Sequence, residues 1–154
     1  MKTNKLTQSV YNFVFSELSI FFIAFTSMLG SLIFQYVYNL PPCALCITQR
    51  YFMYPIAFIA AVGILLRKKL YPLYLILASI GGVIATYHVY IEQTGTPSAL
   101  GACSQGQSCN EIVLELFGFL TIPMMSLGAF VVIVVISTVG IINGRKNRIV
   151  NQEM

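Results

Sequence analysis

Four long runs of apolar residues, separated by short polar segments, dominate the hydropathy pattern of the chain. They extend over about residues 18–38, 47–66, 71–91 and 117–142. A helix needs about 20 consecutive apolar residues to cross the hydrocarbon core of a bilayer. The pattern therefore predicts an all-α membrane protein, built as a bundle of four transmembrane helices.

Composition supports a membrane setting. The chain of 154 residues is 57% hydrophobic and only 9% charged, whereas about 25% of the residues in a soluble domain are charged. The four runs occupy most of the sequence, so we expect residues 1–154 to form a single membrane domain. The first run exceeds the roughly 7–15 apolar residues of a secretory signal, and no small-x-small cleavage site follows it. We therefore expect it to remain as a span.

The basic residues indicate the orientation of the bundle. Loops 39–46 and 92–116 contain no Lys or Arg. Cytoplasmic loops are enriched in Lys and Arg, so both termini are predicted to be cytoplasmic and both of these loops extracytoplasmic. Cations that sit at span ends do not form a nucleic-acid surface, and we expect no nucleic-acid partner. The clusters that carry this prediction are Lys2 and Lys5, Arg67–Lys69, and Arg145, Lys146 and Arg148.

Four cysteines form two close pairs, Cys43–Cys46 and Cys103–Cys109, one in each extracytoplasmic loop. Disulfides persist outside the cytosol, and four cysteines allow three connectivities. Pairing near neighbours stabilises the fold by only about 2 kcal/mol, against about 4 kcal/mol for a Cys43–Cys103 bond. Short-range redox couples are therefore favoured over structural disulfides. A four-cysteine zinc site is disfavoured by the spacing of the second pair and by the oxidising setting, and no metal is expected.

Cys43-Ala-Leu-Cys46 lies where the second span begins. Unpaired backbone N–H groups at a helix N-terminus stabilise an anion, so Cys46 is expected to be the thiolate. A thiolate attacks a disulfide or a quinone, and at the lipid boundary a lipid-soluble oxidant can reach it. Arg50 follows four residues later on the same helix face. It is expected to stabilise the thiolate and to bind a quinone carbonyl, although an interfacial Arg can also extend towards lipid phosphate.

Other polar residues within or beside the spans allow more than one interpretation. His88, the only histidine, could bind a quinone oxygen, transfer protons, or form an ordinary interhelical hydrogen bond. Glu17 is expected to be solvated. Tyr71 and Tyr74 fit either an aromatic belt at the inner interface or the filling of the bundle. Residues 111–116 are expected to form a short interfacial helix or the start of the fourth span.

The chain resembles the disulfide-bond-formation protein B family, which includes DsbB and its Gram-positive counterpart BdbC. The second cysteine pair is close together, as in the BdbC branch. The resemblance covers nearly the whole chain from the first span to the fourth. The matching segments are Pro42-Cys-Ala-Leu-Cys-Ile-Thr-Gln-Arg50, Tyr87-His-Val-Tyr90 and Phe117-Gly-Phe-Leu-Thr-Ile-Pro123, together with the Cys103–Cys109 pair.

This resemblance implies a thiol:quinone oxidoreductase of a bacterial cell (inner) membrane. A secreted or periplasmic thioredoxin-fold oxidase, DsbA-like or BdbD-like, would be reoxidised through attack on Cys103 of the Cys103–Cys109 disulfide. Electrons would then pass to Cys43–Cys46 and on to menaquinone or ubiquinone from the membrane quinone pool. The resemblance places Arg50, His88 and Ile122 at the quinone. The known pathway of this kind is the DsbA–DsbB–quinone system, which keeps the bacterial periplasm oxidising.

Two alternatives remain at this point. A vitamin K epoxide reductase-like enzyme would also pass electrons through a four-helix bundle, but here the C-x-x-C unit opens the second span and not the last. A membrane scaffold with two structural disulfides would lose stability on reduction and would show no absorbance change with quinone.

Overall fold

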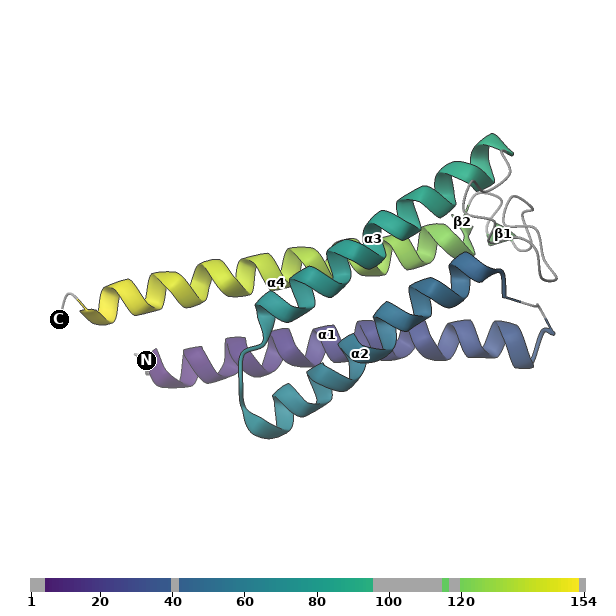
Figure 1. Ribbon diagram of the computed structural model, residues 1–154. Helices are drawn as coiled ribbons and strands as arrows, with labels where there is room; N and C mark the ends of the chain where they lie inside the picture. Colours follow the sequence, from purple (N-terminus) through teal and green to yellow (C-terminus); the bar gives the residue numbers. More distant parts are fainter. Residues whose placement is uncertain (1–4, 40–41, 96–114, 117–119, 153–154) are drawn as a thin grey trace.

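Figure 1 shows the computed structural model, which describes residues 5–39, 42–95, 115–116 and 120–152. Side chains are described for residues 16–39, 42–95 and 121–145. Four long helices account for nearly all of this structure. They are α1 (Lys5–Tyr36), α2 (Ala44–Leu66), α3 (Tyr71–Thr94) and α4 (Ile122–Gln152).

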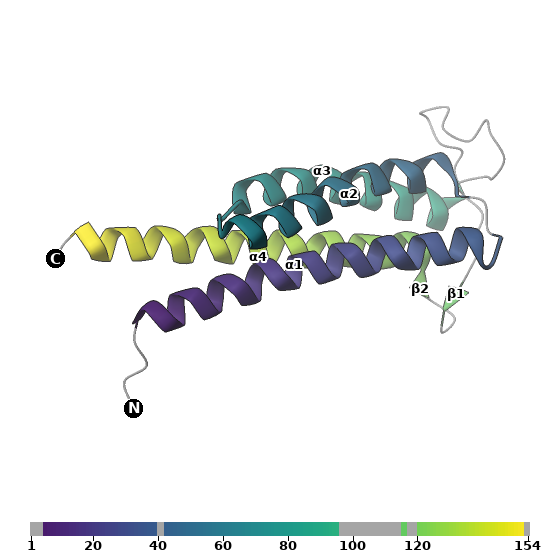
Figure 2. The same cartoon turned by 90° about the horizontal axis from the view of Figure 1, so that it is seen from below.

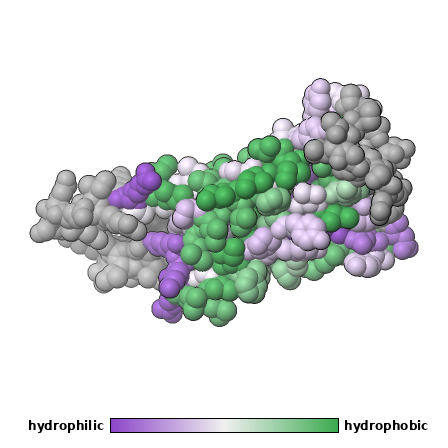
Figure 3. Space-filling model, viewed as in Figure 1, coloured by the Kyte–Doolittle hydropathy of each residue, from purple (hydrophilic) through white to green (hydrophobic). Residues whose placement is uncertain are grey.

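Each helix contains a segment that is long and apolar enough to cross a membrane, which confirms the four-span fold. These segments are Ser16–Tyr36, Ala44–Leu66, Tyr71–Thr94 and Ile122–Arg145. In Figure 3, hydrophobic residues cover the middle of the face shown, and hydrophilic residues lie towards its two ends. A lipid-facing band between two polar ends is the surface expected of a protein that spans a bilayer.

The predicted start of the fourth span, residue 117, was wrong. Helix α4 begins at Ile122, and just before it the strand β2 (Leu120–Thr121) pairs antiparallel with β1 (Glu115–Leu116). Residues 111–116 were expected to form a short interfacial helix or the start of the fourth span. Glu115–Leu116 form a strand instead, and residues 111–114 lie outside the described structure. Pro123 occupies the first turn of α4, where its missing N–H costs little. The backbone of Leu120–Thr121, just before this turn, pairs with β1.

The helices form a ring in which α1 packs on α2 and α4, and α3 packs on α2 and α4. Helix α1 begins and α4 ends at the same end of the bundle, as Figures 1 and 2 show. We call this end, which also carries the α2–α3 turn with Arg67–Lys69, the basic end. The opposite end, where α2 begins at Cys43–Cys46, is called the cysteine end.

Small residues let the helices approach closely in the core. Gly81 of α3 lies against the ring of Phe130 from α4, and an added Cβ at Gly81 would overlap that ring. Phe130 itself is fully buried. Close approach through small residues is how helices associate within a bilayer, because burial from lipid gives little hydrophobic gain.

The basic end corrects the expectation for Glu17 and decides between the two alternatives for Tyr71 and Tyr74. Glu17 is not solvated but fully buried, and its Oε2 accepts a hydrogen bond from the Tyr74 hydroxyl at 2.8 Å. Tyr71 and Tyr74 are also buried, so they fill the bundle instead of forming an interfacial belt. The Tyr71 and Ser16 hydroxyls lie 2.6 Å apart and link α3 to α1. These polar atoms are buried in pairs because an unpaired polar group within the bundle is costly.

Candidate active site

The Cys43–Cys46 pair lies at the first turn of α2, as the sequence predicted. Cys43 is the N-cap residue, and its Sγ accepts a hydrogen bond from the Cys46 N–H at 3.4 Å. The two sulfur atoms are 3.2 Å apart, and no disulfide joins them. The cap uses the short spacing of the C-x-x-C unit, because an N-cap side chain bonds to the N–H group two or three residues later.

The two sulfur atoms are not equivalent. Cys43 is buried and Cys46 is partly exposed, and the Cys43 thiol donates its hydrogen bond to Cys46. This hydrogen bond, together with burial, raises the pKa of Cys43 to about 12. The proton is thus held on Cys43, which leaves Cys46 as the sulfur atom that can carry negative charge.

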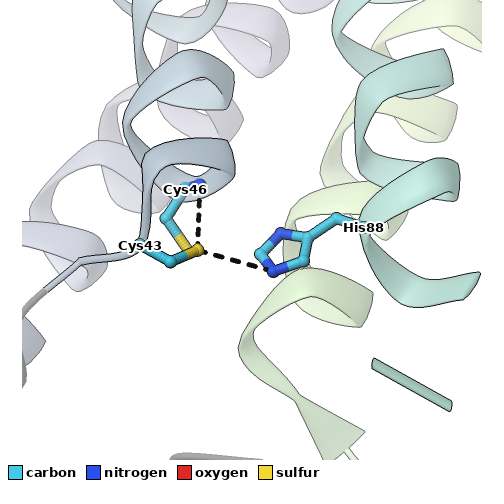
Figure 4. A group of neighbouring side chains, drawn as sticks. All are labelled: Cys43, Cys46 and His88. Atoms are coloured by element: carbon cyan, nitrogen blue, oxygen red, sulfur yellow. Dashed lines mark hydrogen bonds between the residues drawn. The ribbon is translucent and has the colours of Figure 1, made fainter. Parts of the chain in front are cut away.

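His88 reaches the dithiol from α3. Its Nε2 lies 3.5 Å from Cys43 Sγ, and Figure 4 shows the ring pointing across to that sulfur. On its other side, Nδ1 lies 3.0 Å from Gln49 Nε2 of α2. Gln49 Oε1 in turn accepts from the Ser126 hydroxyl of α4 at 2.5 Å. Side chains from three helices therefore converge on Cys43.

Arg50 lies one turn beyond Cys46 on α2, and α1 holds its guanidinium group. Arg50 donates through Nε to the Ser31 hydroxyl and through Nη2 to the Ser31 carbonyl at 2.9 Å. It also donates through Nη1 to Gln35 Oε1. Arginine has five N–H donors in a planar fork, and these three bonds fix its plane relative to α1.

A cavity of about 280 Å³ lies between α1, α2 and α4, next to Cys46 and Arg50. This volume is close to the lower end of the roughly 300–1,000 Å³ typical of small-molecule sites. Its wall is mainly apolar, with Met53, Ile122 and Phe130 among the lining side chains, and Gln49 and Ser126 contribute polar atoms. An apolar molecule with a few polar atoms would match this lining.

Cys43, Cys46 and His88 also have the donor types of a soft metal site, and their ligand atoms lie within 4.8 Å of one another. Zinc and other thiophilic ions are bound by thiolate sulfur and by the lone pair of a neutral imidazole. Here Nε2 of His88 faces the Cys43 sulfur atom, and Nδ1 faces the Gln49 amide nitrogen. A metal ion bound here would need the lone pair of the imidazole on Nε2.

The structure brings together most of the residues singled out in the sequence. Cys46, Arg50 and Ile122 line the same cavity, although Ile122 is more than 70 residues away in the chain. His88 is not among the residues that line this cavity and contacts Cys43 instead. Its interhelical hydrogen bond, one of the roles considered for it, is present. Cys103 and Cys109 lie outside the described residues.

Sequence reasoning missed the residues that support this site. Gln49 and Ser126 orient His88, and Ser31 and Gln35 hold Arg50. Gln49 could have been found, because it is a polar residue three positions after Cys46 and therefore on nearly the same helix face. Ser126 gave no such signal, since serine is common in spans and the sequence does not specify which helix it faces.

A second buried polar pair lies at the cysteine end. Glu92 is one turn beyond His88 on α3, and its Oε2 accepts a hydrogen bond from the Thr121 hydroxyl at 2.7 Å. Both side chains are buried. This bond ties the end of α3 to the strand residue that precedes α4, which helps to hold Ile122 and Ser126 beside α2.

Comparison with known proteins places these observations in a family. Residues 15–140 match the family model described as "Disulfide bond formation protein DsbB". The chain is 39% identical over 127 residues to "Probable disulfide formation protein C 2" of Bacillus anthracis, covering 82% of this chain and 90% of that protein. It is 39% identical over 132 residues to "SPbeta prophage-derived disulfide bond formation protein B" of Bacillus subtilis, covering 84% and 87%.

A third relative supports the same assignment at lower identity. "Disulfide bond formation protein C" of Bacillus subtilis is 34% identical over 116 residues, covering 73% of this chain and 83% of that protein. The matches extend over most of each protein, so they do not depend on an isolated motif.

Proposed function

The chain belongs to the disulfide bond formation protein DsbB family, and from that premise we propose that it reoxidises a secreted thioredoxin-fold oxidase and passes the electrons to a membrane quinone. Family membership and the four spans make it a multi-pass membrane protein of a disulfide-generating oxidoreductase family. The partner, the quinone and the sidedness of the loops belong to the proposal. The Bacillus relatives support a bacterial cell membrane, and the distribution of Lys and Arg supports an orientation with both cysteine loops outside.

The proposed sequence of exchanges balances at each step. The reduced dithiol of the partner attacks the Cys103–Cys109 disulfide and leaves as a disulfide, so that Cys103 and Cys109 become a dithiol. This dithiol reduces the Cys43–Cys46 disulfide by a second exchange and becomes a disulfide again. Each exchange proceeds through a mixed disulfide and transfers one electron pair.

The last step uses the residues around the cavity. A bound quinone would accept the two electrons and two protons released when Cys43 and Cys46 form their disulfide. Cys46 faces the cavity and is the sulfur atom that can carry negative charge, since Cys43 holds the proton between them. Arg50, oriented by α1, would donate hydrogen bonds to an oxygen as charge develops there. The apolar lining and Ile122 would hold a ring and exclude water.

The single observation that carries this proposal is the position of Cys46. Its sulfur atom lies beside a mainly apolar cavity that a guanidinium group also lines. A structural disulfide needs no such cavity, whereas a dithiol that reduces a lipid-soluble oxidant does. Zinc binding is less well supported, because two thiols in an oxidising, extracytoplasmic setting are expected to form a disulfide.

A reconstituted assay tests the proposal. The purified protein in lipid nanodiscs is mixed with a short-chain quinone and a reduced thioredoxin-fold oxidase, and quinone absorbance is followed. Wild type should consume the quinone with one partner disulfide formed per quinone. Cys103→Ser and Cys109→Ser should lose turnover with the protein partner yet still reduce quinone when dithiothreitol reduces Cys43–Cys46 directly. Full turnover of Cys103→Ser with the protein partner, or no quinone consumption by wild type with either reductant, would contradict the proposal.

A further inference from the structure

Three hydrogen bonds connect Ser126 of α4 to Cys43 at the start of α2. The Ser126 hydroxyl lies 2.5 Å from Gln49 Oε1, Gln49 Nε2 lies 3.0 Å from His88 Nδ1, and His88 Nε2 lies 3.5 Å from Cys43 Sγ. Gln49 and His88 are 5% and 3% exposed. Water therefore has little access to the two middle members, and the protein decides which atoms carry the protons.

The chemistry of the amide gives this chain of bonds a direction. A glutamine side chain accepts only through its oxygen and donates only through its nitrogen. Because the Ser126 hydroxyl donates to Gln49 Oε1, the NH₂ group of Gln49 faces His88 and can only donate. His88 Nδ1 must then accept, and the proton of the neutral ring lies on Nε2. Every donor in the chain points towards Cys43.

Among the described residues, the ring of His88 has hydrogen-bond contacts with Gln49 and Cys43. Glu92 lies on the same face of α3, but its carboxylate accepts from Thr121. The Ser126 hydroxyl also lies 3.0 Å from the carbonyl of Pro123, which can only accept. The single hydroxyl proton lies between these two acceptors, and Gln49 Oε1 is the nearer one at 2.5 Å. Gln49, whose NH₂ group faces His88, is therefore the side chain that determines the position of the proton on His88.

We propose that Gln49, oriented by Ser126, is a positioning residue that keeps the imidazole proton on Nε2 of His88, so that His88 donates a hydrogen bond to the Cys43 sulfur. The inference rests on the proposed function and adds that His88 and Arg50 serve different sulfur atoms of the dithiol. Cys43 must release its proton when the Cys43–Cys46 disulfide forms. The His88 N–H stabilises the negative charge on Cys43 from inside the bundle, while Arg50 lies on the cavity side with Cys46.

The position of the proton can be measured directly, because His88 is the only histidine in the chain. Selective ¹⁵N labelling of histidine gives one pair of ring nitrogen signals, and their chemical shifts report which nitrogen is protonated. In reduced wild-type protein near pH 8, we expect Nε2 to be protonated and Nδ1 to be a lone-pair nitrogen. A proton on Nδ1 would overturn the proposal.

Two variants test whether Gln49 and Ser126 are responsible. Gln49→Leu removes the donor to Nδ1, and Ser126→Ala frees the amide to rotate. Both should move the two nitrogen shifts towards each other, as expected for a mixture of tautomers. Thr138→Val is a matched control, since among the described residues the Thr138 hydroxyl bonds to its own helix, at the Val134 carbonyl. Its spectrum should match wild type. Unchanged shifts in both Gln49→Leu and Ser126→Ala would overturn the proposal.

A rate measurement connects the tautomer to the reaction. Reduced protein is mixed with excess quinone, and closure of the Cys43–Cys46 disulfide is followed by rapid quenching with an alkylating reagent. One neutral hydrogen bond corresponds to roughly a 3–10-fold change in rate, so Gln49→Leu and Ser126→Ala should close the disulfide more slowly by about this factor. If Gln49→Leu fails to fold, the milder Ser126→Ala decides.

The two levels of the proposal can fail separately. The nitrogen shifts are recorded without quinone or partner, so their outcome does not depend on the electron acceptor. If wild type consumes no quinone but the shifts follow expectation, the proposed function is wrong and the role of Gln49 stands. If quinone is consumed and both variants close the disulfide at the wild-type rate, the role of Gln49 in the reaction is wrong.

Discussion

Both ends of the bundle bury ionisable side chains, but they do so in different ways. At the cysteine end, Cys46 and Arg50 border a cavity between three helices. At the basic end, Glu17 and Tyr74 are fully buried against each other, and neither lines that cavity. Ionisable residues inside membrane spans are costly and commonly mark functional sites. The comparison teaches that burial of an ionisable residue is by itself a weak indicator of a functional site, whereas a nucleophile that borders a cavity is a strong one.

The contacts of Glu17 indicate a structural role for the buried residues of the basic end. Its carboxylate accepts from the hydroxyl of Tyr74, which lies in the first turn of α3 just after the α2–α3 turn. Gly63 leaves room for the Tyr74 hydroxyl, which would lie 3.0 Å from an added Cβ. Glu17 Oε1 has no hydrogen-bond partner among the described residues. The Tyr74 bond attaches α1 to the start of α3, which is a structural role.

The largest effect should come from removing the Cys46 sulfur. We expect Cys46→Ser to lower quinone reduction at least about 1,000-fold, because a serine hydroxyl cannot form the disulfide that releases the electron pair. Quinone absorbance in nanodiscs measures this, with circular dichroism to verify the helical fold. If Cys46→Ser retained a tenth of wild-type turnover, the cysteine end would not be the reactive end of the bundle.

Arg50 should have the next largest effect. Arg50→Met removes a charged donor from the cavity wall, and a charge-assisted hydrogen bond corresponds to roughly 10–100-fold in kcat/KM for quinone. Arg145→Met, an exposed arginine at the basic end, is the matched control and should leave turnover unchanged. Equal losses in the two variants would indicate a general effect of net charge and not a role for the cavity.

The reactivity of Cys43 tests the pairing of the two thiols. Its pKa is raised to about 12, first by the hydrogen bond with Cys46 and then by burial. A raised pKa keeps the thiolate scarce below pH 12, so wild-type Cys43 should alkylate slowly at pH 9. Cys46→Ala removes the largest cause and lowers the pKa, which should speed alkylation roughly tenfold for each unit of decrease.

Mass spectrometry of the Cys43 peptide measures this rate, in a reduced background in which Cys103 and Cys109 are serine. Cys46→Ser keeps a hydroxyl group at position 46 and should show a smaller increase than Cys46→Ala. A rate in Cys46→Ala that equals or falls below that of wild type would mean that Cys46 does not hold the proton on Cys43.

The smallest effect on the reaction should come from the basic end. Tyr74→Phe removes the hydroxyl that donates to Glu17, and leaving a buried acceptor with one donor fewer should lower the free energy of unfolding by about 1–3 kcal/mol. Quinone turnover should stay within about twofold of wild type at temperatures where the variant is folded. Unfolding in mixed micelles measures the stability, and Tyr90→Phe, at an exposed tyrosine, is the control.

Much of the candidate site could be predicted from the sequence because it is local to one helix. The C-x-x-C unit precedes an apolar run, so Cys46 had to lie near a helix N-terminus. The four-residue spacing then put Arg50 on the same face. Both residues line the cavity in the structure. By contrast, the start of α4 was predicted five residues too early, because an apolar run does not reveal where strand pairing ends and a helix begins.

The amino-acid sequence by itself determined four membrane-spanning helices, a family, and the residues that share one face of α2, since each depends on hydropathy and helical period. The tertiary structure alone decided that His88 contacts Cys43, that Ser126 orients Gln49, and that Glu17 is buried under Tyr74. These contacts join different helices, and their partners depend on how far each helix is rotated and shifted against the next. That arrangement follows from close packing at residues such as Gly81 and Phe130, which no single helix specifies.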